Sequence, residues 1–138
     1  MNTDFLGYRK LVAYQQASEV VKLVYTLVKK FPKEEQFALC SQLRRAAVSI
    51  TSNIAEGVSR YSYRDKIHFL EIAFGSLMEV MSQLEIATEM GYITIDDRKS
   101  VEIKINRTAQ LITGLQYSFM QKDECGNVIK PQSNAIKN

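Results

Sequence analysis

The chain has 138 residues, of which 46% are hydrophobic and 24% are charged, and its formal net charge is +3 at pH 7. This composition is typical of one globular domain and excludes collagen-like, Pro-rich and low-complexity chains, since only 2 Pro and 6 Gly are present. No apolar stretch approaches the ~18 residues of a membrane span, and we expect no signal peptide. Cys40 and Cys125 lack zinc-ligand or disulfide-framework spacing, which favours a reduced, cytoplasmic setting.

The first predicted helix ends before Pro32, whose ring cannot continue the hydrogen-bond ladder. Its apolar residues recur at steps of three and four, the spacing of one helix face: Ala13, Ala17, Val20, Val24, Leu27 and Phe31. Glu34 and Glu35 follow and predict the first turn of a second helix, because acidic residues favour a helix N-terminus. The apolar row of that helix is Leu39, Leu43, Ala47, Ile50 and Ile54. Gly57 is predicted to stop it in a left-handed conformation.

Capping spacings predict the start of two further helices. Ser62 precedes Asp65 by three residues, and Thr94 precedes Asp97 in the same way. Gly91 is predicted to end the third helix. The apolar row of the third helix is Ile67, Leu70, Phe74, Leu77, Met81, Leu84 and Thr88, and that of the fourth is Val101, Ile105, Thr108, Ile112, Leu115 and Phe119. Residues 101–105 also alternate like a strand, but the row continues for two more turns and favours a helix.

These four amphipathic segments, joined by short connections, predict an all-α fold: an antiparallel up-down four-helix bundle over residues 1–121. Residues 122–138 show no period and are predicted to form a flexible tail. The apolar stripes are wider than one bundle core requires. The additional residues are Tyr14, Val21, Tyr25 and Val28 in the first helix, and Phe69, Ile72, Ala73, Met78 and Val80 in the third. Two interpretations fit: a wide core stripe, or a second buried face between subunits.

Signals of catalysis and of cofactor binding are weak. His68 is the single histidine and has no acid or nucleophile at matching spacing. A metal site would require more His or Cys ligands than the chain offers, and the glycines are too scattered to form a phosphate-binding loop. We therefore expect no enzyme, no cofactor and no metal.

A polar stripe runs along the second predicted helix, beside its apolar row. Its members are Arg45, Ser49, Asn53 and Glu56, and a similar row on the third helix holds Ser76, Glu79 and Gln83. We expect Arg44 or Arg45 to pair with Glu79 and Asn53 to bond between the helices. Such a network would fix helix register, although a ligand site remains an alternative. Gly75, in the middle of a helix, predicts the close approach of another helix.

Charge divides unevenly along the chain. Residues 1–66 hold 11 Lys/Arg and 6 Asp/Glu, whereas residues 67–97 hold 6 Asp/Glu and no Lys or Arg. The candidate nucleic-acid-binding residues are Arg44, Arg45, Arg60, Arg64 and Lys66. Tyr61 and Tyr63 lie among them, and basic residues with aromatics can hold phosphates and stack on bases. A solvated charged loop is the alternative.

The segment QLRRAAVSITSNIAEG over residues 42–57 is followed by Arg60, Ser62, the stretch FLEIA over residues 69–73, Gly75-Ser76 and Glu79. This pattern resembles the bacterial four-helix bundle proteins encoded within intervening sequences of 23S ribosomal RNA genes. The same family includes the accessory variability protein of diversity-generating retroelements. The likeness covers residues 10–120, although Tyr14 stands where the family often has Trp.

The resemblance implies a homopentameric ring that stands its bundles side by side. It also implies binding of RNA or DNA, or of a partner such as a reverse transcriptase. We therefore expect a cytoplasmic, non-enzymatic ring that binds nucleic acid or a nucleic-acid-processing protein. A purely protein-binding assembly scaffold is the alternative.

Overall fold

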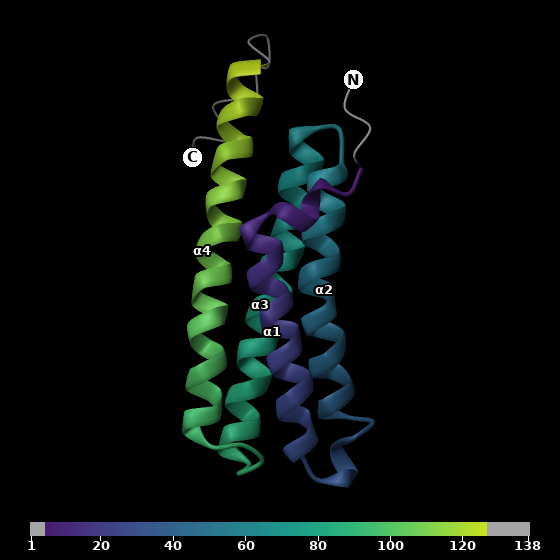
Figure 1. Cartoon of the computed structure of the whole chain (residues 1–138), viewed down its shortest axis with the longest axis vertical. Helices are drawn as coiled ribbons and strands as arrows, with labels where there is room; N and C mark the ends of the chain where they lie inside the picture. The colour runs from purple at the N-terminus through teal and green to yellow at the C-terminus, as the bar shows by residue number, and fades with distance from the viewer. Residues whose placement is uncertain (1–4, 127–138) are drawn as a thin grey trace.

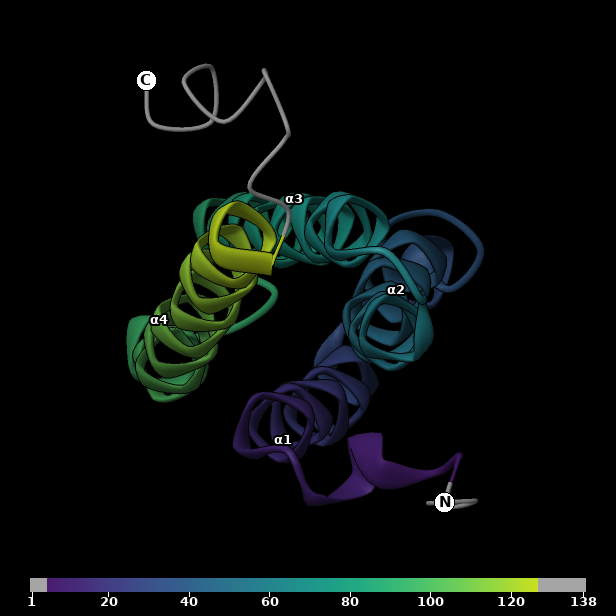
Figure 2. The ribbon, with the colours of Figure 1, turned by 90° about the horizontal axis from the view of Figure 1, so that it is seen from above.

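A computed structural model of the chain describes residues 5–126, which form a bundle of four α-helices (Figure 1). The helices are α1 (Val12–Leu27), α2 (Leu39–Ser59), α3 (Tyr63–Glu89) and α4 (Ile95–Gly126). Short 3-10 turns, η1 (Gly7–Lys10), η2 (Val28–Lys30) and η3 (Lys33–Glu35), flank α1 and lead into α2. Seen from above, the helices follow one another around a square, with α1 and α3 at opposite corners (Figure 2). The predicted all-α up-down bundle is confirmed. No helix in this part of the chain is long and apolar enough to cross a membrane.

The core follows the predicted rows of α1 and α2 closely, since every residue of both rows except half-buried Leu39 is buried. In α3 the buried row is shifted by a fraction of a turn. Leu70, Leu77 and Leu84 are fully buried as predicted, but Phe74 and Met81 are only half-buried at the core edge. The smaller Ala73, Val80 and Ala87 lie deeper and have no exposed surface. The three leucines belong to two apolar rows of α3, one with Phe74 and Met81 and one with the smaller residues. Periodicity alone therefore did not determine which row faces the core.

The predicted limits of the second helix are wrong at both ends. Glu34 and Glu35 belong to η3, and α2 begins at Leu39. Glu35 still serves this N-terminus, because its Oε1 accepts a hydrogen bond from the Leu39 N–H at 3.3 Å. Gly57 does not stop the helix but lies buried inside it. A Cβ at Gly57 would lie 3.0 Å from the Phe69 Cβ, so this glycine allows α2 and α3 to pack closely.

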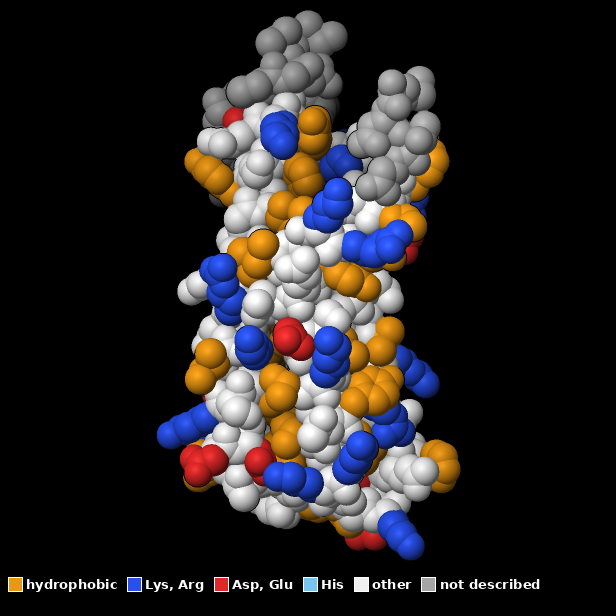
Figure 3. Space-filling model, in the orientation of Figure 1, with side chains coloured by type: hydrophobic (Ala, Val, Ile, Leu, Met, Phe, Trp, Pro, Cys, Tyr) orange, Lys and Arg blue, Asp and Glu red, His pale blue; other side chains and the backbone are white. Residues whose placement is uncertain are grey.

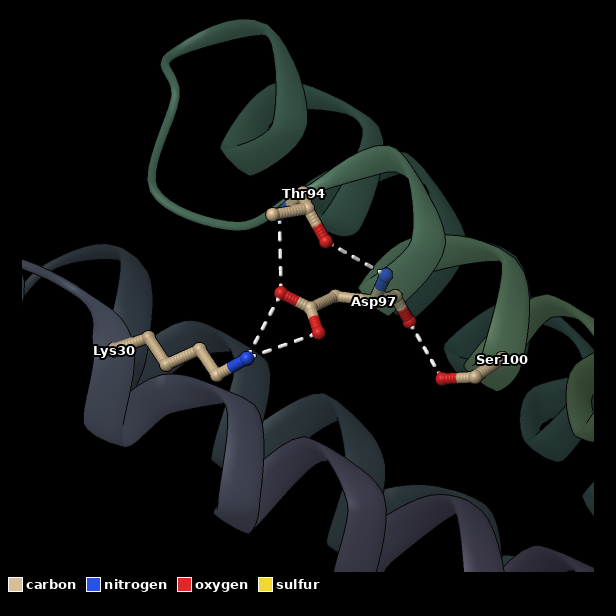
Figure 4. A network of polar contacts seen from close by, with 4 residues as sticks. All are labelled: Lys30, Thr94, Asp97 and Ser100. Carbon is tan, nitrogen blue, oxygen red and sulfur yellow. Dashed lines mark hydrogen bonds and ion pairs between the residues drawn. The ribbon is translucent and has the colours of Figure 1, made fainter.

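Both predicted caps form. The Ser62 Oγ accepts a hydrogen bond from the Asp65 N–H at 3.0 Å at the start of α3. At the start of α4, the Asp97 N–H donates to the Thr94 Oγ at 3.0 Å and the Thr94 N–H donates to the Asp97 carboxylate at 3.1 Å (Figure 4). The Lys30 Nζ reaches the same carboxylate at 2.9 Å, which ties the end of the first helical segment to α4 (Figure 4).

The last turn of α3 ends as predicted, because Gly91 has a φ of +78°, which favours glycine. The predicted C-terminal tail starts within helical chain, since α4 continues from residue 122 to Gly126. Residues 127–138, the rest of that predicted tail, lie outside the described residues.

Candidate nucleic-acid interface

The five basic residues predicted to bind nucleic acid do not form one patch. Arg44 and Arg45 lie in the first half of α2, whereas Arg60 follows its last residue. A helix rises 1.5 Å per residue, so about 22 Å of α2 separates Arg45 from Arg60. The fold therefore divides the predicted cluster between the first turns of α2 and the α2–α3 turn.

At the α2–α3 turn, two of the three predicted cations are engaged within the fold. Arg60 forms an ion pair with Glu56, and its guanidinium carbon lies 4.5 Å from the centre of the Phe69 ring. The Lys66 Nζ donates to the Val58 carbonyl at 2.8 Å. Both side chains thus have structural roles at this end of the bundle.

Burial lowers the pKa of Lys66, and the nearby Lys122 ammonium lowers it further. Both ammonium groups lie beside the Phe119 ring, at 5.6 and 5.8 Å from its centre. Tyr63 packs on the same ring at 5.8 Å, whereas Tyr61 is fully exposed. The predicted pair of tyrosines is therefore split between a packing residue and a surface residue. Arg64 and Arg60 are both exposed, and Arg60 is the one held by Glu56.

The two predicted polar rows meet between α2 and α3. The Ser49 and Ser76 Oγ atoms are 2.9 Å apart, and the Gln83 Nε2 donates to the Gln42 Oε1 at 3.3 Å. The prediction that Asn53 bonds between the helices is wrong. Its Nδ2 donates to the Ser49 carbonyl and Oγ on its own helix, at 2.8 and 3.0 Å, because the two residues are one turn apart.

The predicted ion pair to Glu79 is absent from the described residues. The Arg44 Nη2 instead donates to the Gln36 carbonyl at 3.3 Å. Arg45 and Glu79 are exposed at the rim of a shallow groove whose lining is Gln42, Arg45, Ala46, Ser49, Ser76 and Glu79. Water competes for charges at such a rim, so their pairing would contribute little.

The interpretation of Gly75 as a close-packing position within the bundle is also wrong. Nothing lies within 4 Å of a Cβ placed at Gly75, and the residue is exposed. Glu56, predicted to join the polar network, pairs instead with Arg60.

A basic surface that the sequence reasoning missed lies on α1 and its flanking turns. Residues 7–35, which form α1 and its flanking turns, hold six Lys/Arg and three Asp/Glu. Lys29 is exposed, and so is Lys22, which has a loose 3.6 Å ion pair with Glu19. Lysine and arginine side chains lie along the face over α1 and α4, with few acidic side chains among them (Figure 3). The uneven charge distribution along the chain was the signal that could have located this surface.

The start of α2 lies beside the end of α1, since the Cys40 Sγ contacts the Val28 carbonyl at 3.7 Å. Arg44, one turn further along α2, is therefore level with the last turns of α1. Tyr25, three residues before Val28 and therefore on the same side of the helix, is 42% exposed. The α1–α2 surface thus combines cations from two helices with an aromatic ring.

Nucleophile and metal chemistry find little support in the described residues. Burial raises the pKa of the Cys40 thiol, which outweighs the opposing effect of Arg44, so the thiolate is disfavoured. His68 is exposed, with its ring centre 5.6 Å from that of Phe69. Between residues 5 and 126, no group of three or more His, Cys, Asp or Glu residues has the arrangement of a metal site.

Comparisons with known proteins agree with the helical architecture. The family model for the 23S rRNA-intervening sequence protein matches residues 9–114. A solved structure from Bacteroides thetaiotaomicron, described as a protein of unknown function from the S23 ribosomal protein family, is 24% identical with a TM-score of 0.70. The alignment covers 76% of this chain and 98% of that one, and it shows a shared fold. A comparison with curated proteins finds no match.

Proposed function

Because the chain belongs to the 23S rRNA-intervening sequence protein family, we propose that it is a cytoplasmic, non-enzymatic protein whose copies form a ring, a homopentamer, and bind nucleic acid. The ligand is held through the sugar-phosphate backbone of RNA or DNA, without reading of base sequence. A nucleic-acid-processing protein such as a reverse transcriptase is the partner that would share this nucleic acid.

The observation that carries the proposal is the separation of charge across the bundle. The cations of residues 9–33 are on α1 and its flanking turns, whereas residues 67–97, mostly α3 at the opposite corner, hold acidic residues and no cation (Figure 2). A polyanion is attracted to the side with the basic turns and repelled by the side with acidic α3. Lysine and arginine side chains on one face are the usual electrostatic footprint of phosphate binding.

Exposed apolar residues support a ring. Of the additional apolar set, Val28, Ala73 and Val80 are buried within one bundle, as the wide-core interpretation predicts. Ile72 and Met78 remain 39% and 40% exposed. Each copy in a ring would repeat the α1 surface, so several weak phosphate contacts would act together on one nucleic acid.

Titration of a labelled structured RNA and a labelled DNA duplex at two salt concentrations tests nucleic-acid binding. Affinity should fall steeply with added salt, because bound cations release counterions from the phosphates. Lys29→Gln should weaken binding and lower the slope of log K against log salt by about one.

Arg64→Gln removes the same charge at the far end of the bundle and serves as the matched control. It should change the slope less than Lys29→Gln does. Equal effects would show that phosphate binding is not confined to the surface around α1. Absence of affinity for both nucleic acids at low salt would refute nucleic-acid binding and leave the protein-binding scaffold as the remaining function.

A further inference from the structure

We infer that the outer face of α3 docks against the outer face of α4 of the next copy, and that this contact joins the subunits. The inference rests on the proposed ring and assigns the two surfaces that form it. It follows from three properties of the two faces: exposed apolar residues, open glycines and opposite charge.

The outer face of α3 carries an exposed row of residues with helical spacing. Ile72, Gly75, Glu79, Ser82 and Ile86 recur at steps of three and four, and all are exposed. Ile72 and Ile86 are 39% and 48% exposed, although isoleucine is among the residues most often buried. Gly75 weakens the helix relative to alanine, yet nothing in the bundle lies within 4 Å of a Cβ placed on it.

The outer face of α4 has a matching row at the same spacing. Its members, Ile103, Arg107, Gln110, Gly114 and Tyr117, are all exposed. Ile103 is 70% exposed and Tyr117 is 62% exposed. Gly114 is a second interior glycine with nothing within 4 Å of a Cβ placed on it. Each helix therefore presents large apolar side chains and one open glycine to solvent.

The relative height of the two helices is fixed by contacts within one subunit. Both Tyr63 and Lys66 contact Phe119, and α3 and α4 run in opposite directions from the short turn between Glu89 and Ile95, so Gly75 lies near the level of Gln110 and Ser82 near that of Ile103. In a ring whose axis is parallel to the bundles, all copies stand at the same height. The same levels then apply between α3 of one copy and α4 of the next.

At these levels the two faces are complementary. Ile72 lies near the level of Gly114, and Ile103 lies near that of Ser82, so large side chains face small ones. Glu79 lies near the level of Arg107, and among the described residues neither side chain has an ion pair, although Glu79 accepts a hydrogen bond from Gln83 at 3.3 Å. Opposite charge and alternating side-chain size thus select the same register.

The positions of the two helices suit a closed ring. A contact between different faces adds subunits head to tail and closes only if successive copies turn. Because α3 and α4 occupy neighbouring corners of the square (Figure 2), each copy is rotated relative to the previous one, as a closed ring requires. Docking through opposite corners, α1 and α3, would instead extend an open row. This arrangement leaves the basic α1–α2 surface free.

Charge reversal tests the assignment, with particle mass measured by light scattering and native mass spectrometry. Glu79→Arg and Arg107→Glu should each convert the ring to monomers, and the double variant should restore the ring mass. Both residues are exposed, and helical circular dichroism checks that each variant is folded.

Two matched controls reverse a charge away from the contact. Glu85→Arg lies a third of a turn around α3 from Glu79, and Lys29→Glu lies on α1. Both should keep the ring mass. A wild-type ring that survives both single reversals would overturn the α3–α4 assignment while the proposed ring stands. A monomeric wild type would overturn the ring and this contact together, whereas nucleic-acid binding is tested separately by its salt dependence.

Discussion

Two glycines that both lie inside helices have opposite roles. Both Gly57 and Gly75 lie inside helices, and both interrupt otherwise good helical sequence. The distinction lies in their neighbours: Gly57 faces the Phe69 Cβ and the Lys66 carbonyl, whereas Gly75 faces open space within the subunit. The sequence pattern predicts a helix end at Gly57 and a close helix contact at Gly75. Both predictions fail, because the spatial neighbours of a residue cannot be identified from its position along the chain.

Gly57→Ala should lower the stability of the bundle. The added methyl would lie 3.0 Å from the Phe69 Cβ and 3.3 Å from the Lys66 carbonyl oxygen, and neither atom can move without shifting backbone. Overpacking of this kind costs about 1–3 kcal/mol and exceeds the roughly 1 kcal/mol gained in helix propensity. Urea unfolding measures the difference.

The control for Gly57→Ala is Gly75→Ala in the Glu79→Arg background, where the proposed subunit contact is broken. It should raise stability by up to about 1 kcal/mol, since alanine favours the helix and meets no neighbour. A stabilising Gly57→Ala would show that α2 and α3 can separate to accept the methyl.

Arg45→Met should leave the stability of the subunit within about 0.5 kcal/mol of wild type. Arg45 is exposed and has no ion pair with Glu79, so no charge is stranded when the guanidinium is removed. Thermal unfolding provides the measurement. A loss of several kcal/mol would indicate a buried pair that the structure does not contain.

At the scale of the helices, capping positions were predictable because a cap depends on residues three apart in sequence. Thr94 and Asp97 satisfy each other's backbone N–H groups at the start of α4 as their spacing predicts. The contact of Lys30 with Asp97 was not predictable, since 67 residues separate the two. The buried row of α3 and the first residue of α2 were predicted wrongly for the same reason. Both depend on contacts with neighbouring helices.

Thr94→Ala should destabilise the bundle by about 1 kcal/mol, the usual effect of losing an N-cap side chain. Thr113→Ala is the matched control on the same helix, because its hydroxyl bonds only to the Ala109 carbonyl one turn away. Chemical unfolding of the two variants gives the comparison. Equal losses would mean that the cap contributes nothing beyond helix propensity.

Stability should also decline in acid through Asp97. The Thr94 N–H chiefly, and then Lys30, lower the pKa of its carboxyl below the ordinary value. A carboxyl with a lowered pKa in the folded state stabilises the fold above its unfolded pKa of about 3.9. That contribution is lost as the pH falls from there through the lower folded pKa.

Between neutral and acidic pH, the free energy of unfolding should therefore fall less in Asp97→Asn than in wild type. Urea unfolding at both pH values measures this difference. Asp96→Asn, a neighbouring exposed carboxyl with no ion pair in the described residues, is the control. If both variants follow the wild-type acid profile, Asp97 is not the group responsible.

At the scale of the whole molecule, helix count, order and direction were predictable, because periodicity and short connections leave few arrangements. The candidate interface was less predictable from the sequence. The five predicted basic residues lie at both ends of α2 and in α3, while Lys29 precedes α2 in the chain and Arg44 lies beside it, because the start of α2 packs against the end of α1. A surface is defined by which helices are neighbours, and that information is absent from any single segment.

The separation of the basic turns that flank α1 from acidic α3 gives each subunit an electric dipole across its width. A polyanion approaching from a distance would turn the molecule before touching it, so that encounters begin with α1 in front. Salt should then slow association more than it hastens dissociation, a kinetic asymmetry that rapid-mixing measurements can detect.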